Sequence, residues 1–257
     1  MSSPRTAANP DAITWRTVGW AVAIVAVLSA VVWVVFPDTY HWHWSALLKY
    51  RALFFKGWLL MLGVSVAAML LSVVGGFLLM LGTRSPWEVL RVFCQGYIAI
   101  MRGTPLLVVL LLGYYGLVSP LRLAEALPAG TLLLAAFEAA YLAEIFRGAL
   151  DSVGRSQREA ARAVGFDTWQ MYRFVLIPQS VRRALPGMTG ELVSLVKSSS
   201  LLSIIGVEEV TQVAKSMNSS SYTALEGYIP LALAYLVVTL PLTWMARRLE
   251  RRFAYET

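Results

Sequence analysis

Five ionisable side chains fall within long apolar stretches of the sequence, and their types allow ion pairing or the binding of a charged solute. They are Glu138, Glu144 and Arg147 in the run at 129–150, and Glu191 and Lys197 in the run at 184–207. A charge at the centre of a membrane helix costs about 2.5 to 3.5 kcal/mol on insertion scales. We therefore expect both runs to face protein or water.

Glu138 lies near the middle of its run, where a carboxylate could take the ammonium group of a ligand. Lys197 and the three hydroxyl residues that follow it, Ser198, Ser199 and Ser200, could contact a ligand in the same pathway. The alternative is that Glu138 and Lys197 neutralise each other between neighbouring helices.

Glu144 and Arg147 stand three residues apart, so they share one face of a helix and can pair with each other. A structural ion pair, or an arginine that reaches the interface, is favoured over a role in ligand binding.

The elements that must position these residues are membrane helices, because 58% of the 257 residues are hydrophobic and only 14% are charged. Six runs are long enough to cross a bilayer, which takes about 20 residues. They cover 18–36, 57–82, 103–121, 129–150, 184–207 and 227–246. The predicted fold class is an all-α integral membrane protein with six spans.

The distribution of the 22 lysines and arginines predicts the orientation. Most of them fall in one alternating set of connecting segments, which the positive-inside rule places in the cytoplasm together with both termini. The net charge of +7 is spread over these segments, so it favours lipid orientation over nucleic-acid binding. The first run is predicted to be a retained anchor because its uncharged stretch is too long for a signal peptide.

Histidine and cysteine give little support for a metal site. His41 and His43 alternate with Trp42 and Trp44 after the first run, and no third ligand is evident. An aromatic belt at the membrane interface is the favoured interpretation of this tetrapeptide. Cys94 is the single cysteine, so we expect no metal and no internal disulfide.

The segment at 151–183 predicts two short helices. Ser156 and Glu159 have the spacing of a capping box that would start a helix at Gln157, and Gly165 would end it after about eight residues. Asp167 repeats the start signal, and the second helix should stop near Ile177, before a proline.

The first of these helices has three alanines, Ala160, Ala161 and Ala163, which would let another backbone approach closely. The alternative is an amphipathic helix on the lipid headgroups, but such a helix needs a large apolar face. Docking to a partner is therefore favoured.

Several motifs in fixed order resemble the permease subunits of ABC importers, particularly the polar amino acid uptake group. The matching residues are Glu159-Ala160-Ala161 with Gly165 and Ile177-Pro178, Arg102-Gly103-Thr104-Pro105-Leu106-Leu107, residues 140–148 and residues 201–207. The first set resembles the cytoplasmic EAA loop of that family, and the second resembles its R-G-T-P-L-L signature.

The resemblance implies a five-helix type I importer core at 46–257. One extra transmembrane helix with its outer loop would precede it at 18–45, after a cytoplasmic tail at 1–17. It also implies a coupling loop at 151–183 that contacts an ATPase through Arg158, Glu159, Ala160, Ala161 and Gly165. A structural signature is implied for Arg102, Gly103, Thr104, Pro105, Glu144 and Arg147.

The resemblance further implies a multi-pass subunit of a bacterial inner membrane that imports polar or charged amino acids by alternating access. Its partners would be a dimer of ABC ATPases, a second copy or a related permease, an extracytoplasmic amino acid binding protein and lipid. ATP and Mg would bind in the ATPase. The chain itself has no G-x-x-x-x-G-K-[ST] phosphate loop, because none of its lysines follows a glycine, so we expect a non-catalytic subunit without its own cofactor.

Other membrane classes find less support. A membrane enzyme would need paired catalytic groups at one depth, and no Ser/His pair or repeated aspartate supplies them. Rings of polar residues typical of channels and inverted repeats typical of secondary carriers are not evident.

Overall fold

The computed structural model describes residues 42–223 and 225–254, together with seven residues between 19 and 30. The chain divides into two units, residues 1–43 and residues 44–257. The predicted tail at 1–17 and most of the predicted first span lie outside the described residues, as does His41. Six spans and the orientation of the termini therefore stay predictions.

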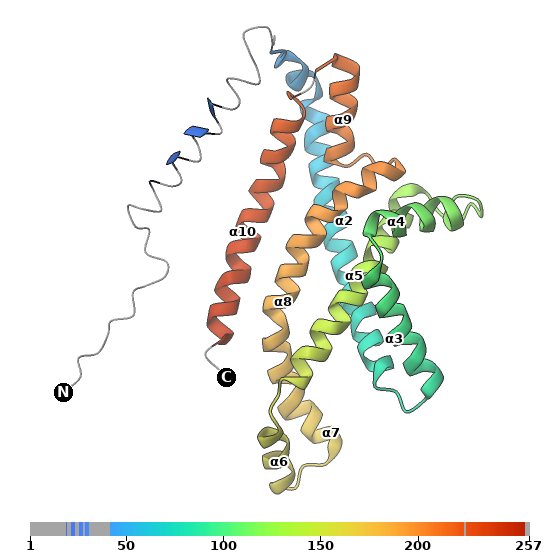
Figure 1. Cartoon of the computed structure of the whole chain (residues 1–257), viewed down its shortest axis with the longest axis vertical. Coiled ribbons are helices and arrows are strands. Elements are labelled where there is room, and N and C mark those ends of the chain that lie inside the picture. Colours follow the sequence, from blue (N-terminus) through green and yellow to red (C-terminus); the bar gives the residue numbers. More distant parts are fainter. Residues whose placement is uncertain are drawn as a thin grey trace, which may run out of the picture. The chain divides into compact units, whose positions relative to one another are not determined.

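In the described residues of the unit at 44–257, every regular element is a helix. Its α-helices are α2 (Ser45–Thr83), α3 (Glu88–Gly103), α4 (Leu106–Leu111), α5 (Ala126–Asp151), α6 (Arg155–Ala163), α7 (Thr168–Met171), α8 (Ile177–Ser198), α9 (Val210–Ser221) and α10 (Tyr228–Ala254). Two π-helical segments, η1 (Leu112–Val118) and η2 (Tyr172–Leu176), and a 3-10 segment, η3 (Ser199–Ile205), continue some of them. Helices α6 and α7 lie at one end of the long helices and α9 at the other (Figure 1).

Four helical stretches of the described residues are long and apolar enough to cross a membrane. They are Ser45–Thr83, Ala126–Asp151, Thr168–Ile205 and Tyr228–Phe253. These stretches confirm the predicted apolar spans at 57–82, 129–150, 184–207 and 227–246, although three of them extend well beyond the predicted bounds.

The predicted span at 103–121 is shorter than expected: its helical part is Leu106–Val118, which is long enough to cross a membrane only together with α3. Helix α3 ends at Gly103, and the stretch from Leu106 to Val118 starts after a bend of 111°. Thr104 is extended, with ψ of 137°, because a residue before proline avoids the helical region. Pro105 then stands directly before the next helix. The Thr104-Pro105 step therefore separates α3 from the stretch Leu106–Val118, and the two pieces can form one membrane span only as a bent pair.

Helices α2 and α5 pack closely through small residues. A Cβ atom added to Gly76 on α2 would lie 2.8 Å from the Cβ atom of Leu142 on α5. Ser72 of α2 donates a hydrogen bond from Oγ to the carbonyl oxygen of Ala135 on α5, at 3.0 Å. Small residues allow such approach between membrane helices, where dispersion contacts and hydrogen bonds hold the helices together.

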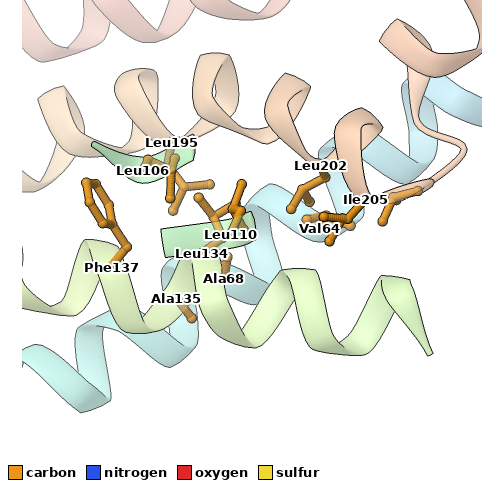
Figure 2. Packing of buried hydrophobic residues seen from close by; sticks show 11 residues of the cluster. Val64, Ala68, Leu106, Leu110, Leu134, Ala135, Phe137, Leu195, Leu202 and Ile205 are labelled. Atoms are coloured by element: carbon orange, nitrogen blue, oxygen red, sulfur yellow. The ribbon is translucent and has the colours of Figure 1, made fainter. Parts of the chain in front are cut away.

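Apolar side chains from separate elements meet in one buried cluster around α5 (Figure 2). Leu134 and Phe137 come from α5, Leu195 from α8, Leu110 from α4 and Val64 from α2. The cluster thus holds the piece after the Thr104-Pro105 break against the α5 and α8 pair, which carries all five ionisable residues of the apolar runs.

Candidate functional site

Helix α6 begins earlier than the sequence pattern predicts. Its first residue is Arg155, its N-cap is Gly154, and no side chain caps it. The predicted capping box of Ser156 and Glu159 is wrong, because Ser156 already lies inside the first turn. The first helical bond runs from the amide of Gln157 to the carbonyl of Gly154, at 3.2 Å.

The predicted end of this helix at Gly165 is confirmed. Gly165 has φ of +84°, the left-handed conformation that a residue with a Cβ atom adopts only at a cost. The amide of Gly165 donates to Arg162, and the amide of Phe166 donates to Ala161 at 3.0 Å. These bonds satisfy carbonyls at the end of the helix and turn the chain sharply.

One face of α6 is fixed to the membrane helices and the other is open. Ala161 is buried in a cluster with Leu150, Val153 and Leu176. Arg158 is half-buried and donates from Nη2 to the carbonyl oxygen of Leu150 in the last turn of α5. The predicted contact residues Glu159 and Ala160 are exposed, as are Arg162 and Ala163.

An aromatic surface beside α6 escaped the sequence analysis. We call it the aromatic patch; it consists of Val164, Phe166, Trp169 and Phe174. Val164 and Trp169 expose 71% and 67% of their surface. The rings of Trp169 and Phe174 meet edge to face with centroids 6.0 Å apart. Large apolar residues among the arginines of 155–173 were the signal that could have found it, since such exposed patches mark contact surfaces.

The second predicted helix starts as expected but does not stop as expected. Asp167 and Gln170 form a complete capping box at the start of α7. The chain then passes through the π-helical segment η2 directly into α8, so a stop near Ile177 is wrong. Pro178 is tolerated because it lies in the first turn of α8, where the lack of an N–H group costs little helical hydrogen bonding. The segment at 177–183 therefore belongs to a membrane helix.

The charged residues of the predicted structural signature form an ion-pair network. The predicted pairing of Glu144 with Arg147 is confirmed, with N–O distances of 2.8 and 3.0 Å. Arg102 reaches the same carboxylate at 3.3 Å. Asp151 pairs with Arg147 and Arg84, which ties the ends of α2, α3 and α5 together. These side chains are partly exposed, so each ion pair contributes only about 0.2 to 1 kcal/mol to the stability of the fold.

Gly103, Thr104 and Pro105, the other members of this signature, act through the backbone. Gly103 is the last residue of α3, Thr104 is its extended C-cap, and Pro105 is the N-cap of α4. The three residues make the bend described above and leave Arg102 at the end of α3, where it also lies 5.6 Å from the centre of the Tyr141 ring.

The predicted alternative pairing of Glu138 with Lys197 is wrong. The carboxyl group of Glu138 on α5 lies beside that of Glu191 on α8, within hydrogen-bonding reach. Glu138 is 2% exposed, and its Oε2 atom has no hydrogen-bond partner among the described residues. Lys197 is exposed instead.

The serines after Lys197 differ from the predicted set of hydroxyl donors. Ser199 donates to the carbonyl oxygen of Val196, and Ser200 donates to that of Lys197. Their hydroxyl protons are thus held by the preceding turn, and Ser199 is fully buried. Ser198 is half-buried.

The exposed side of α8 is polar, which is unusual for a membrane helix. It carries Gly190 and Lys197, with the half-buried Ser194 and Glu191 beside them. Exposed positions of a membrane helix usually carry large apolar side chains, such as Leu70 and Phe77 on α2. Polar groups at membrane depth face protein or water, so this side of α8 borders one of these.

No group of three or more histidine, cysteine, aspartate or glutamate side chains is placed to hold a metal ion among residues 42–223 and 225–254. Trp42 and Trp44 are both partly exposed, and His43 lies between them.

Comparison with known proteins places the chain among membrane transport components. Residues 72–255 match the family model described as binding-protein-dependent transport system inner membrane component. The glutamine transport system permease protein GlnP of Escherichia coli K12 is 32% identical over 217 residues, covering 81% of this chain and 96% of GlnP. The probable amino-acid permease protein YxeN of Bacillus subtilis 168 is 38% identical over 180 residues, covering 69% of this chain and 80% of YxeN.

A solved structure supports the same assignment. A chain of an amino acid ABC transporter crystallised with histidines is 34% identical and superposes with a TM-score of 0.77. The match covers 83% of this chain and the whole of that one. Since the family model matches most of the chain and GlnP is covered almost completely, this protein belongs to the family of binding-protein-dependent transport system inner membrane components.

Proposed function

We propose that this chain is the transmembrane subunit of an ATP-driven importer that moves amino acids across the cytoplasmic membrane by alternating access. An extracytoplasmic binding protein delivers the substrate, and a dimer of separate ATPases, which binds ATP and Mg, supplies the energy. The names of GlnP and YxeN and the amino acid transporter structure support the substrate class.

The proposed coupling to the ATPase rests on one observation: α6 packs on α5 with one face and exposes the other. Ala161 and Arg158 hold one face of the helix to the end of α5, while Glu159 and Ala160 on the other face are exposed. A partner that binds the exposed face and shifts α6 would therefore also shift the end of α5. Helix α5 in turn packs on both α2 and α8, so the motion reaches the helices that border the proposed pathway.

The aromatic patch enlarges the surface available to the ATPase. Trp169 and Phe174 present apolar rings next to the charged face of α6. Aromatic residues in such positions supply much of the binding energy of protein interfaces. Their exposure fits a contact that is completed by the ATPase subunit.

The polar side of α8 supports the position of the pathway. Gly190, Ser194 and Lys197 lie on that side at membrane depth, where contact with lipid would be costly. In an importer with two permease subunits this side would face the translocation pathway between them. The second subunit is either another copy of this chain or a related permease.

Reconstituted complexes test the proposed function. The permease, its ATPase and its binding protein are placed in liposomes, and uptake of labelled amino acids is measured with ATP or with an ion gradient alone. Uptake that needs ATP hydrolysis is the expected result. Uptake driven by the gradient without ATP would overturn the proposal in favour of a secondary carrier.

A matched pair of variants tests the coupling surface. Trp169→Ser should weaken co-purification of the ATPase about tenfold, because it removes a large aromatic contact. Trp87→Ser changes a similarly exposed tryptophan at the start of α3 and should leave the complex intact. Equal retention of the ATPase by both variants would exclude the aromatic patch from the interface.

A further inference from the structure

An apolar groove between α2, α3 and α5 has no role in the proposed function. Its volume is about 920 Å³, toward the upper end of the range of about 300 to 1,000 Å³ for ligand sites. Leu78 of α2 and Leu132 of α5 line the groove although both are exposed, so it is open on one side. An open apolar groove of this size marks a contact with a ligand or with the membrane.

Small residues give the groove its depth. Gly75 of α2 and both Ala136 and Ala139 of α5 line it. A Cβ atom added to Gly75 would lie 3.1 Å from the Cβ atom of Ala139, so the two helices are close together at this point. The Tyr97 hydroxyl of α3 donates its proton to the carbonyl oxygen of Ala136, at 2.7 Å, and is thus already used. The interior of the groove therefore suits a hydrocarbon chain.

One end of the groove is polar and basic. Arg84 and Ser85, which line this end, directly follow the last residue of α2. Arg91 donates from Nη1 to the carbonyl oxygen of Ser85, at 3.3 Å, so a second guanidinium group lies at the same end. Trp87, two residues after Ser85, is exposed, and tryptophan is enriched at the headgroup level of membranes. The groove thus runs from the headgroup level into the apolar part of α2.

The ion-pair network beside this end carries an excess of one positive charge. It joins three arginines through only two carboxylates, and its members are Arg84, Arg102, Arg147, Glu144 and Asp151. Glu88 and Arg91 at the start of α3 add one charge of each sign and leave the excess unchanged. An anionic group is therefore favoured at this end of the groove.

We propose that this groove binds one anionic phospholipid, with the phosphate at Arg84 and an acyl chain between α2, α3 and α5. Basic pockets between membrane helices bind such headgroups, and the apolar groove supplies the matching place for the tail. This inference goes beyond amino acid import and requires only that the chain lies in a membrane.

A second permease subunit is a poorer occupant of the groove. In the proposed importer the polar side of α8 would face that subunit, and the groove, as formed by the described residues, is lined by no residue of α8. A phospholipid carries an anion and a hydrocarbon chain in one molecule, as the basic end and the apolar interior of the groove require.

Native mass spectrometry of the purified permease and ATPase complex tests the site. The complex is released from detergent after incubation with equal amounts of phosphatidylglycerol and phosphatidylcholine that carry the same acyl chains. Wild type should retain phosphatidylglycerol about fivefold more than phosphatidylcholine, which is the effect of one cation at the headgroup level. Equal retention of the two lipids would overturn the proposal.

Arg84→Gln and Asp151→Asn separate a phosphate contact from a structural ion pair. Both variants break the ion pair between these two residues, but only Arg84→Gln removes a cation. Arg84→Gln should lower the preference for phosphatidylglycerol about fivefold, to near parity, whereas Asp151→Asn should preserve or increase it. Loss of the preference in both variants would mean that the ion pair acts only through the fold, and the lipid site would be wrong.

Ala136→Leu and Ala67→Leu test the place of the acyl chain. Ala136→Leu fills part of the groove and should reduce the retention of both lipids several-fold without changing their ratio. Ala67→Leu adds the same bulk at an exposed position of α2 outside the groove and should change nothing. Unchanged lipid retention by Ala136→Leu would exclude the groove as the site.

The same spectra report the number of permease subunits in each complex. If Ala136→Leu separates two permease subunits, the groove is a contact between subunits and the lipid proposal is wrong. If Ala136→Leu does not fold, the comparison of Arg84→Gln with Asp151→Asn still decides the site.

Discussion

Arg158 of α6 donates a hydrogen bond from Nη2 to the carbonyl oxygen of Leu150 in the last turn of α5, over 3.4 Å. Carbonyl oxygens at a helix C-terminus lack partners within the helix, and basic side chains bind there favourably. The Nε atom of Arg158 is buried without a hydrogen-bond partner in the described part of the chain. The Arg158 side chain therefore connects α6 to α5, although the family resemblance implied that it contacts the ATPase.

Replacing Arg158 should uncouple the two helices. Arg158→Met keeps much of the apolar stem but removes the donor, and we expect ATP-driven uptake to fall about tenfold, as loss of a charged hydrogen bond implies. The exposed Arg155 on the same helix supplies the control, since Arg155→Met breaks no described contact. Uptake assays in liposomes check both. Similar uptake by the two variants would show that the contact between Arg158 and Leu150 is dispensable.

Gly165 and Gly148 provide a comparison of backbone conformation alone. A Cβ atom at either position meets nothing within 4 Å, but only Gly165 has a positive φ. Gly165→Ala should strain the end of α6 by about 1 to 2 kcal/mol and reduce coupled uptake. Gly148→Ala, in the regular helix α5, should be neutral or slightly stabilising. Normal uptake by Gly165→Ala would contradict the importance of this turn.

Gly76 and Gly63 test the packing of α2 on α5. Gly76→Ala places a methyl group 2.8 Å from Leu142, and both atoms belong to packed helices that cannot move apart freely. We expect a loss of about 1 to 3 kcal/mol in stability and a lower unfolding temperature in detergent. Gly63→Ala, on the same helix, points into open space and should not destabilise. An unchanged unfolding temperature for Gly76→Ala would rule out tight contact.

The buried carboxyl group of Glu209, which lies outside the membrane spans, should make the stability of the protein depend on pH. It is the N-cap of α9, where its carboxylate accepts from the amides of Thr211 and Gln212. Burial nevertheless raises the pKa of Glu209 from 4.5 to about 7. The folded protein thus binds the proton more tightly than the unfolded chain between these values.

The contribution of Glu209 to stability is fully present below pH 4.5, falls as the pH rises toward about 7, and stays at its low value above that. Subtracting the unfolding temperature of Glu209→Gln from that of wild type across this range isolates the contribution. A difference that grows with rising pH would contradict it.

Features that depend on local sequence were predictable. Four of the six apolar runs, the left-handed Gly165 and the start at Asp167 need only neighbouring residues, and the structure confirms them. The pair of Glu144 and Arg147 follows from helical spacing in the same way. Family motifs, which are also contiguous in sequence, correctly indicated the family.

Features that depend on how helices pack against one another could not be predicted from the sequence. Pro178 looked like a stop signal, but the π-helical segment before it lets the helix continue into α8. The start of α6 at Arg155 likewise escaped the capping pattern, because the packing of Ala161 and Arg158 on α5 fixes the position of that helix.

The carboxyl groups of Glu138 and Glu191 show the same division most clearly. Sequence alone determined that Glu138 and Glu191 lie in membrane helices and need a polar neighbour, because the cost of a charge in lipid is the same in any fold. Only the tertiary structure decided that they face each other, with Lys197 turned to the exposed side. The rotation of α5 against α8 is set by many weak packing contacts between residues far apart in the chain, and no local pattern records it.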